Sequence, residues 1–97
     1  MDYIEEFHPK FKQDLKSIDK SVVKEIQKIH LDNILKNPLS YPALKGKLSS
    51  LRSYHFSKNS VSYRIAYEVI ENNKVIFYYM VAKRENFYKK LENRSKK

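Results

Sequence analysis

The sequence of 97 residues has no cysteine, no tryptophan and a single glycine. Without cysteine it has neither a disulfide framework nor a thiolate ligand for a metal ion, which suits a reducing cytoplasm. No apolar run approaches the roughly 20 residues of a membrane-spanning helix, and the opening MDYIEEFHPK lacks the basic-then-apolar order of a signal peptide. The three histidines have no paired spacing and no carboxylate cluster beside them. We therefore expect a soluble cytoplasmic protein without a membrane segment, a metal or a cofactor.

Positive charge is concentrated in the second half of the chain. Residues 1–44 hold seven lysines and seven acidic residues, whereas residues 45–97 hold thirteen lysines or arginines and only four acidic residues. The whole formal net charge of +9 therefore belongs to the second half. A field of one sign on part of a small domain attracts polyanions and speeds their capture, although lysine used only for solubility gives the same total. Nucleic acid is the leading partner class on charge alone.

The pattern of apolar residues predicts one domain over residues 1–97, with helices near the N-terminus. Residues 2–7 are a short strand candidate, and a helix is expected to start at Pro9. Asp19 is placed to cap a second helix, which Pro38 ends because the residue before a proline avoids helical geometry. The prolines and the glycine of residues 37–50 predict a loop.

Three strands are predicted after this loop. The stretch SYRIAYEV at residues 62–69 alternates strictly, as a strand does when one face packs on a core. Strands are also expected at 52–57 and at 75–82, the latter apolar on both faces, with a short terminal helix that frays into a basic tail from residue 92. The fold class is therefore α+β, in the order β-α-α-β-β-β. A two-helix hairpin should cover one face of a mostly antiparallel four-stranded sheet.

Residues that suit phosphodiester chemistry fall on the other face of this sheet and at its end. Alternation points Ser53, His55 and Arg64 outward on the open face. Lys83 and Arg84 leave the last strand, and Tyr88 follows one helical turn after Arg84. Arginine forks match phosphate oxygens, histidine moves protons near neutral pH, and tyrosine stacks on a base. No metal is needed if the nucleophile is the 2′-hydroxyl of RNA. We expect the histidine, the lysine, the tyrosine and the two arginines to converge on one cleft, rimmed by Arg52 and Lys58.

Each of these residues also has a purely structural interpretation. Arg64 could pair with Glu68 along its own strand, and His55 could be an ordinary surface histidine. Lys83 and Arg84 could be a charge cluster at a helix start, and Tyr88 could serve packing alone. From composition and pattern alone, the sequence indicates a basic α+β domain with the chemistry of an RNA binder.

Three stretches of the second half carry a family resemblance. They are LKGKLSSLRSY at 44–54, YRIAYEV at 63–69 and VIFYYMVAKRENFY at 75–88. In this order and spacing they resemble the RelE/ParE family of bacterial toxins from type II toxin–antitoxin systems, and the predicted helical hairpin extends the likeness over nearly the whole chain.

The resemblance implies the RelE-like fold and a toxin neutralised by a cognate antitoxin. RelE-like members enter the A site of the 70S ribosome and cut the mRNA there as endoribonucleases (mRNA interferases), without metal. The 2′-hydroxyl attacks the adjacent phosphate and leaves a 2′,3′-cyclic phosphate and a 5′-hydroxyl. Carried over to this chain, the catalytic residues are His55, Arg64, Arg84 and Tyr88. The residues expected to bind RNA are Lys45, Lys47, Arg52, Lys58 and Lys83.

The chain departs from the family pattern at the general base. Where the pattern has two lysines in the strand before Tyr-Arg, this chain has His55 and Ser57. His55 is our choice for the base, with Lys58 and Lys83 as rivals. Two other functions stay open: a ParE-like inhibitor of DNA gyrase with the same fold, and an inactive relative that only binds its antitoxin.

Overall fold

The structure is a computed structural model that describes residues 3–95 of the chain. Asp2 of the predicted first strand and residues 96–97 of the predicted tail lie outside the described residues. The strands are β1 (Ile4–Phe7), β2 (Arg52–Lys58), β3 (Val61–Ile70) and β4 (Val75–Lys83). The helices are α1 (Phe11–Lys16), α2 (Lys20–Glu25), α3 (Leu31–Lys36) and α4 (Phe87–Ser95), with a π-helical turn at Ile26–His30 and 3₁₀ turns at Gly46–Leu48 and Arg84–Asn86.

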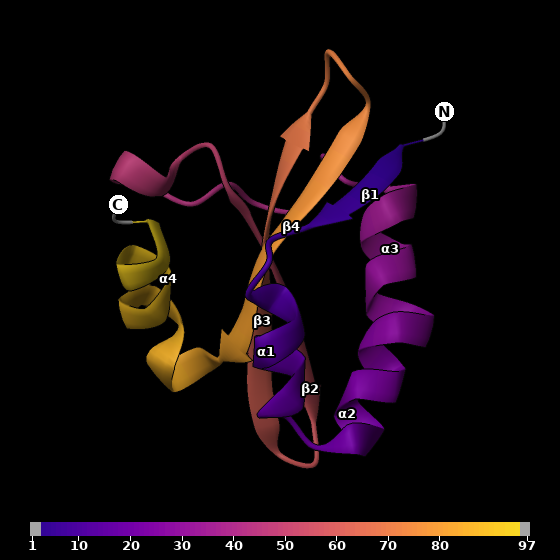
Figure 1. The fold of residues 1–97 in the computed structure, drawn as a ribbon, viewed down its shortest axis with the longest axis vertical. Helices are drawn as coiled ribbons and strands as arrows, with labels where there is room; N and C mark the ends of the chain where they lie inside the picture. Colours follow the sequence, from indigo (N-terminus) through magenta and orange to yellow (C-terminus); the bar gives the residue numbers. More distant parts are fainter. Residues whose placement is uncertain (1–2, 96–97) are drawn as a thin grey trace.

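The sheet confirms the predicted α+β fold class. Its strand order is β1-β4-β3-β2, in which β1 runs parallel to β4 and the other pairs are antiparallel. The helices α1, α2 and α3 lie on one face of this sheet, and α4 lies on the other side of the molecule (Figure 1). None of the described helices is long and apolar enough to span a membrane.

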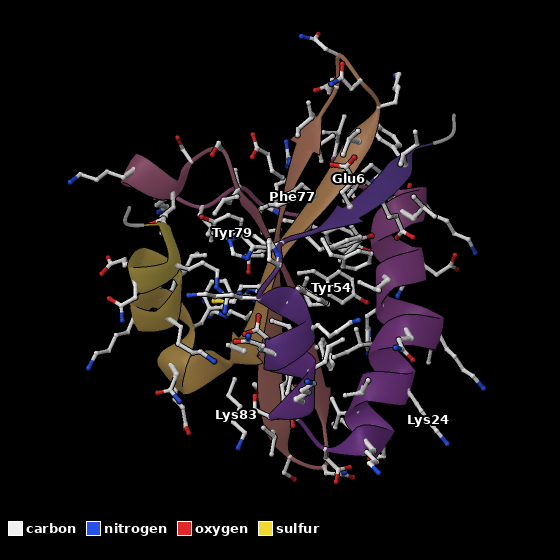
Figure 2. The ribbon with its side chains drawn as sticks, viewed as in Figure 1. Glu6, Lys24, Tyr54, Phe77, Tyr79 and Lys83 are labelled. Carbon is white, nitrogen blue, oxygen red and sulfur yellow. The ribbon has the colours of Figure 1, made fainter. Side chains whose placement is uncertain are left out.

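The predicted second helix is one long helix with a π-helical turn between α2 and α3. Asp19 caps it, since its Oδ2 accepts a hydrogen bond of 3.1 Å from the Ser21 amide. The π-helical turn brings His30 into the interior, where Nδ1 lies 2.8 Å from the Tyr54 hydroxyl and Nε2 lies 2.8 Å from a Glu25 carboxylate oxygen. Figure 2 shows Tyr54 between the sheet and this helix. His30 therefore ties the long helix to β2.

Two hydrophobic clusters pack on the two faces of the sheet. The larger lies under the helices, and its fully buried side chains include Phe11, Val22, Ile26, Ile34, Ile65, Tyr67, Ile76 and Tyr78. The smaller lies under α4 and consists of Leu44, Leu51, Ala66, Met80, Ala82, Phe87 and Leu91. Burial against both clusters explains why β4 is apolar on both faces.

The face opposite the helices is less open than the sequence pattern predicted. The terminal helix covers part of it (Figure 1). Ser53, expected to point outward into solvent, is only 2% exposed, and its amide donates to the Pro42 carbonyl of the preceding loop at 3.0 Å. A β-bulge shifts the register here, because Ala66 pairs with Met80 and Tyr67 pairs with Tyr78. Tyr79 is the extra residue of β4 and packs beside the smaller cluster.

A buried ion pair holds α4 against the rest of the molecule. Arg94 Nη1 and Nη2 lie 2.7 and 2.8 Å from the two carboxylate oxygens of Asp14, and Nη1 also donates to the Tyr79 carbonyl at 2.9 Å. The Val81 amide donates to Asp14 Oδ2 at 3.2 Å. Asp14 is 3% exposed. This anchor keeps α4 helical through Ser95, beyond residue 92 where the sequence pattern predicted fraying.

Replacing Asp14 by alanine should destabilise the fold strongly, because the Arg94 guanidinium would stay buried without its counter-charge. Breaking one partner of a buried pair costs about 3–5 kcal/mol. Urea unfolding of Asp14→Ala and of the wild type measures the loss in free energy of unfolding. The matched control is Asp32→Ala, whose partner Lys36 lies on the helix surface and whose loss should be about 0.5 kcal/mol or less. Equal midpoints for the two variants would contradict the anchor role.

Candidate active site

His55 and Arg64 are direct neighbours across β2 and β3. The antiparallel register pairs His55 with Arg64, and Arg64 in turn with Ala82 of β4. All three side chains point to the face that carries α4, since directly paired residues share one face of a sheet. The predicted convergence of His55 and Arg64 is therefore formed by strand pairing alone.

Three adjoining depressions cross this face, and we name them by their position. The β4-end depression (460 Å³) is lined by Ser60, Val61, Ser62, Lys83, Arg84 and Glu85. The central depression (420 Å³) is lined by His55, Phe56, Ser57, Ser62, Tyr63, Arg64 and Arg84. The α4 depression (540 Å³) is lined by Pro42, Ala43, Leu44, Lys45, Leu48, Ser53, His55, Arg64, Tyr88 and Glu92. Shared lining residues join each depression to the next.

Arg64 is held by aromatic rings and not by an acid. Its guanidinium carbon lies 5.5 Å from the centroid of the Phe87 ring and 5.5 Å from that of the Tyr88 ring, within cation–π range. The alternative pairing with Glu68 is not observed, because no salt bridge within residues 3–95 includes Arg64. The charge of Arg64 is therefore oriented by α4 and is not neutralised by a carboxylate.

His55 is exposed at the junction of the central and α4 depressions. Its Nε2 lies 2.9 Å from the hydroxyl of the buried Ser53. Partial burial of the ring lowers the pKa of His55 below its ordinary value, and the positive charges of Arg64 and Arg84 lower it further. A neutral imidazole is the form that accepts a proton, so the site favours the base form at neutral pH.

Lys83 and Arg84 stand where β4 gives way to the 3₁₀ turn. Both are exposed and line the β4-end depression, and Arg84 also lines the central one. Figure 2 shows Lys83 projecting from the end of β4. Tyr88 follows on α4 with its side chain 49% exposed, so its ring is available at the surface of the α4 depression.

The predicted rim of Arg52 and Lys58 is not formed. Arg52 donates to the carbonyls of Leu39 and Tyr41 at 3.2 and 2.6 Å, and Lys58 pairs with Glu25 of α2 at 3.1 Å. The reason is the alternation of β2, which places both residues on the helical face, opposite His55. Neither side chain lines any of the three depressions.

The two lysines of the loop before β2 are placed differently from each other. Lys45 lines the α4 depression. Lys47 belongs to the 3₁₀ turn that begins at Gly46, whose φ of +67° suits glycine. Lys47 is exposed and lines none of the three depressions.

Sequence reasoning missed two polar residues of the site. Ser53 was expected to face solvent, although its position two residues before His55 on the same strand face was a signal for contact. Glu92 lies four residues after Tyr88, a spacing that puts both on one face of α4. Within residues 3–95, no group of three or more histidine or acidic side chains is arranged to hold a metal ion.

Comparison with known proteins identifies the family. A model of the ParE-like toxin of type II bacterial toxin–antitoxin systems matches residues 6–92. The chain belongs to this ParE-like toxin family. This confirms the resemblance to RelE/ParE toxins found in the sequence. No curated protein sequence gives a significant match to the toxin.

Solved structures of RelE proteins share the fold of the toxin. A mutant of E. coli toxin RelE in the free state has 22% identity and a TM-score of 0.76 over 99% of this chain and 100% of that one. The RelBE2 toxin–antitoxin complex from Mycobacterium tuberculosis gives 16% identity and a TM-score of 0.75 over 87% of this chain and 100% of that one. An archaeal RelE–RelB complex from Pyrococcus horikoshii has 22% identity and a TM-score of 0.61 over 87% of this chain and 97% of that one.

The lowered pKa of His55 in the toxin can be measured directly. We expect the ring protons of His55 to titrate in an NMR experiment with a midpoint below the ordinary value of about 6.5. Because part of the shift comes from neighbouring cations, Arg84→Ala should move the midpoint upward. Lys24→Ala is the control, since Lys24 points to solvent from α2 (Figure 2). A midpoint at or above 6.5 in the wild type would be inconsistent with this electrostatic arrangement.

Proposed function

We propose that the toxin is a ribosome-dependent endoribonuclease that cleaves mRNA in the A site without a metal ion. One observation carries the proposal: His55, Arg64, Arg84 and Tyr88 line connected depressions on one face. Neither of the two arginines belongs to an ion pair within residues 3–95. Paired guanidinium groups beside a neutral imidazole suit a phosphodiester that must gain negative charge during reaction.

In the proposed reaction His55 acts as the general base. When its Nε2–H donates to Ser53 Oγ, Nδ1 keeps a free lone pair and accepts the proton of the 2′-hydroxyl. The bond from the 2′-oxygen to phosphorus forms as the bond to the 5′-oxygen breaks, which gives a 2′,3′-cyclic phosphate and a 5′-hydroxyl. Arg64 and Arg84 bind the non-bridging oxygens. The leaving 5′-oxygen takes a proton from the Lys83 ammonium, which lines the adjoining depression.

The charge distribution supports capture by a large RNA assembly. The net charge of +9 arises entirely from residues 45–97, and four cations from this part of the chain, Lys45, Arg64, Lys83 and Arg84, line the three depressions. Such a field speeds association with RNA and makes binding sensitive to salt. The requirement for the ribosome rests on the family resemblance.

A cognate antitoxin is the proposed protein partner. The similar solved structures include RelBE2 and archaeal RelE–RelB complexes. An acidic segment of such a partner would complement the basic face, and an amphipathic one would suit the apolar depression of 490 Å³ beside α1, which Phe7, Phe11, Leu15, Ile26 and Leu31 help to line. Binding over the basic face would block the catalytic residues.

Arg64→Ala should abolish mRNA cleavage and toxicity while the fold and antitoxin binding survive, because the phosphate loses its strand-borne guanidinium. We expect a fall in rate of roughly 100-fold or more, as for loss of a group that stabilises developing charge. Primer extension on a translating mRNA, with and without ribosomes, measures the cleavage. Lys24→Ala, which removes a cation from the helical face, should cut like the wild type.

Other outcomes of this experiment would redirect the assignment. Loss of the fold in Arg64→Ala would make Arg64 structural. Intact mRNA and normal translation with the wild-type toxin would contradict the nuclease function, and a gyrase supercoiling assay would then test the ParE-like alternative. Inactivity in both assays with retained antitoxin binding would indicate an inactive relative.

His55→Ala should slow cleavage by about 100-fold, because general base catalysis typically contributes 10²–10⁴-fold. In the wild type the rate should fall as the pH drops through the lowered pKa of His55, since protonation removes the base. Single-turnover cleavage on programmed ribosomes at several pH values measures both effects. An unchanged rate in the variant would pass the role to Lys83, because Lys58 is paired with Glu25 on the far face.

A further inference from the structure

Glu92 is a residue of the α4 depression that the proposed cleavage reaction does not use. It is the one carboxylate among the lining residues of this depression. No salt bridge within the described part of the chain joins it to Lys45 or to any other cation. An ionised carboxylate repels phosphate and can only accept hydrogen bonds. Glu92 therefore suits a part of the substrate that donates N–H groups.

The walls of the α4 depression suit a planar ring. Tyr88 offers a half-exposed aromatic face, and Pro42, Leu44 and Leu48 supply apolar surface. Aromatic stacking is a general way of holding an unpaired RNA base. The volume of 540 Å³ falls within the range of about 300–1,000 Å³ for small-ligand sites.

We propose that the α4 depression is a guanine-binding site. The base stacks on Tyr88, the Glu92 carboxylate accepts from the N1–H and the N2 amino group, and the Lys45 ammonium donates to O6. Lysine to the O6 and N7 of guanine is a common specific contact in nucleic-acid recognition. The inference rests on the proposed function, to which it adds the identity of the preferred base.

The other bases do not complement this pair of charges. Guanine presents two adjacent N–H donors and then a carbonyl oxygen along one edge. Adenine and cytosine each place a ring nitrogen acceptor beside their amino group, and the N3–H of uracil stands between two carbonyls. In all three a carboxylate that accepts one hydrogen bond also faces a lone pair, which is unfavourable. An acceptor at Glu92 with a donor at Lys45 therefore selects guanine.

The depression is joined to the reaction site by two shared residues. His55 and Arg64 line both the α4 and the central depression. A base in the α4 depression therefore belongs to a nucleotide beside the scissile phosphate. Guanine selection at this position would fix which phosphate reaches Arg64, and so would set the cleavage position within a codon.

A binding experiment tests the site without requiring cleavage. The probes are 2′-O-methyl trinucleotides with a central guanine or a central adenine, in which the 2′-hydroxyl is blocked, titrated into ¹⁵N-labelled toxin by NMR. We expect the wild type to prefer guanine by roughly fivefold or more, as a bidentate contact to a base gives. In Glu92→Gln the ratio of the affinities for the guanine and adenine trinucleotides should fall to about one, because the amide replaces one acceptor with a donor. Glu71→Gln, at an exposed turn, is the matched control and should keep the preference.

A cleavage experiment separates this proposal from the proposed function. Primer extension compares messages that differ only by guanine or adenine at the cleaved codon. Guanine-selective binding without any cleavage would support the site and contradict the nuclease function. Cleavage with equal trinucleotide affinities in the wild type, or an unchanged preference in Glu92→Gln, would overturn the guanine site and leave the nuclease function standing.

Discussion

The ion pair between Asp14 and Arg94 is the constraint on which the face with the three depressions depends. It joins α1 to α4 across the edge of β4, and its two partners also bind the carbonyl of Tyr79, the extra residue of the β-bulge, and the Val81 amide. Because both carboxylate oxygens of Asp14 and both Nη atoms of Arg94 are hydrogen-bonded, the desolvation of the two charges is offset by hydrogen bonds. Because the pair fixes the last turn of α4, it fixes the first turn as well, where Phe87 and Tyr88 contact Arg64. An ion pair at the edge of the sheet therefore helps to orient Arg64 on the face that carries α4.

The cations on the two faces of the sheet differ in whether they are paired with carboxylates. On the helical face Lys58 is paired with Glu25, and beneath α4 Arg94 is paired with Asp14. The cations that line the depressions, Lys45, Arg64, Lys83 and Arg84, belong to none of the salt bridges within residues 3–95, and Arg64 is oriented by aromatic rings. Rings hold a guanidinium in place without cancelling its charge. The positive field is thus kept where an anion can bind, and together with the partial burial of the ring, which is the larger cause, it lowers the pKa of His55.

Local pattern was enough to predict the strands, the helical hairpin and the convergence of His55 with Arg64, since alternation and strand order decide which side chains share a face. It was not enough for the interaction that anchors α4, because Asp14 and Arg94 are 80 residues apart in the chain and neither stands out by local spacing. The burial of Ser53 likewise depends on tertiary packing, because residues of the preceding loop and of α4 surround the depression that it lines. The rim expected from Arg52 and Lys58 was a different kind of error, because the alternation that placed His55 outward also places both residues on the helical face.

One short helix serves both the core and the site. Phe87 and Leu91 of α4 are fully buried in the smaller cluster, whereas Tyr88 and Glu92, each one residue further on, line the α4 depression. Positions of one helix that differ by 100° in direction can change independently when they contact different surroundings. The buried pair must keep its volume for α4 to stay docked and for Arg64 to stay oriented. Of the exposed pair, Tyr88 also contacts Arg64, whereas Glu92 has no such role. The base preference proposed for Glu92 can therefore change without altering the orientation of Arg64 or the packing of α4.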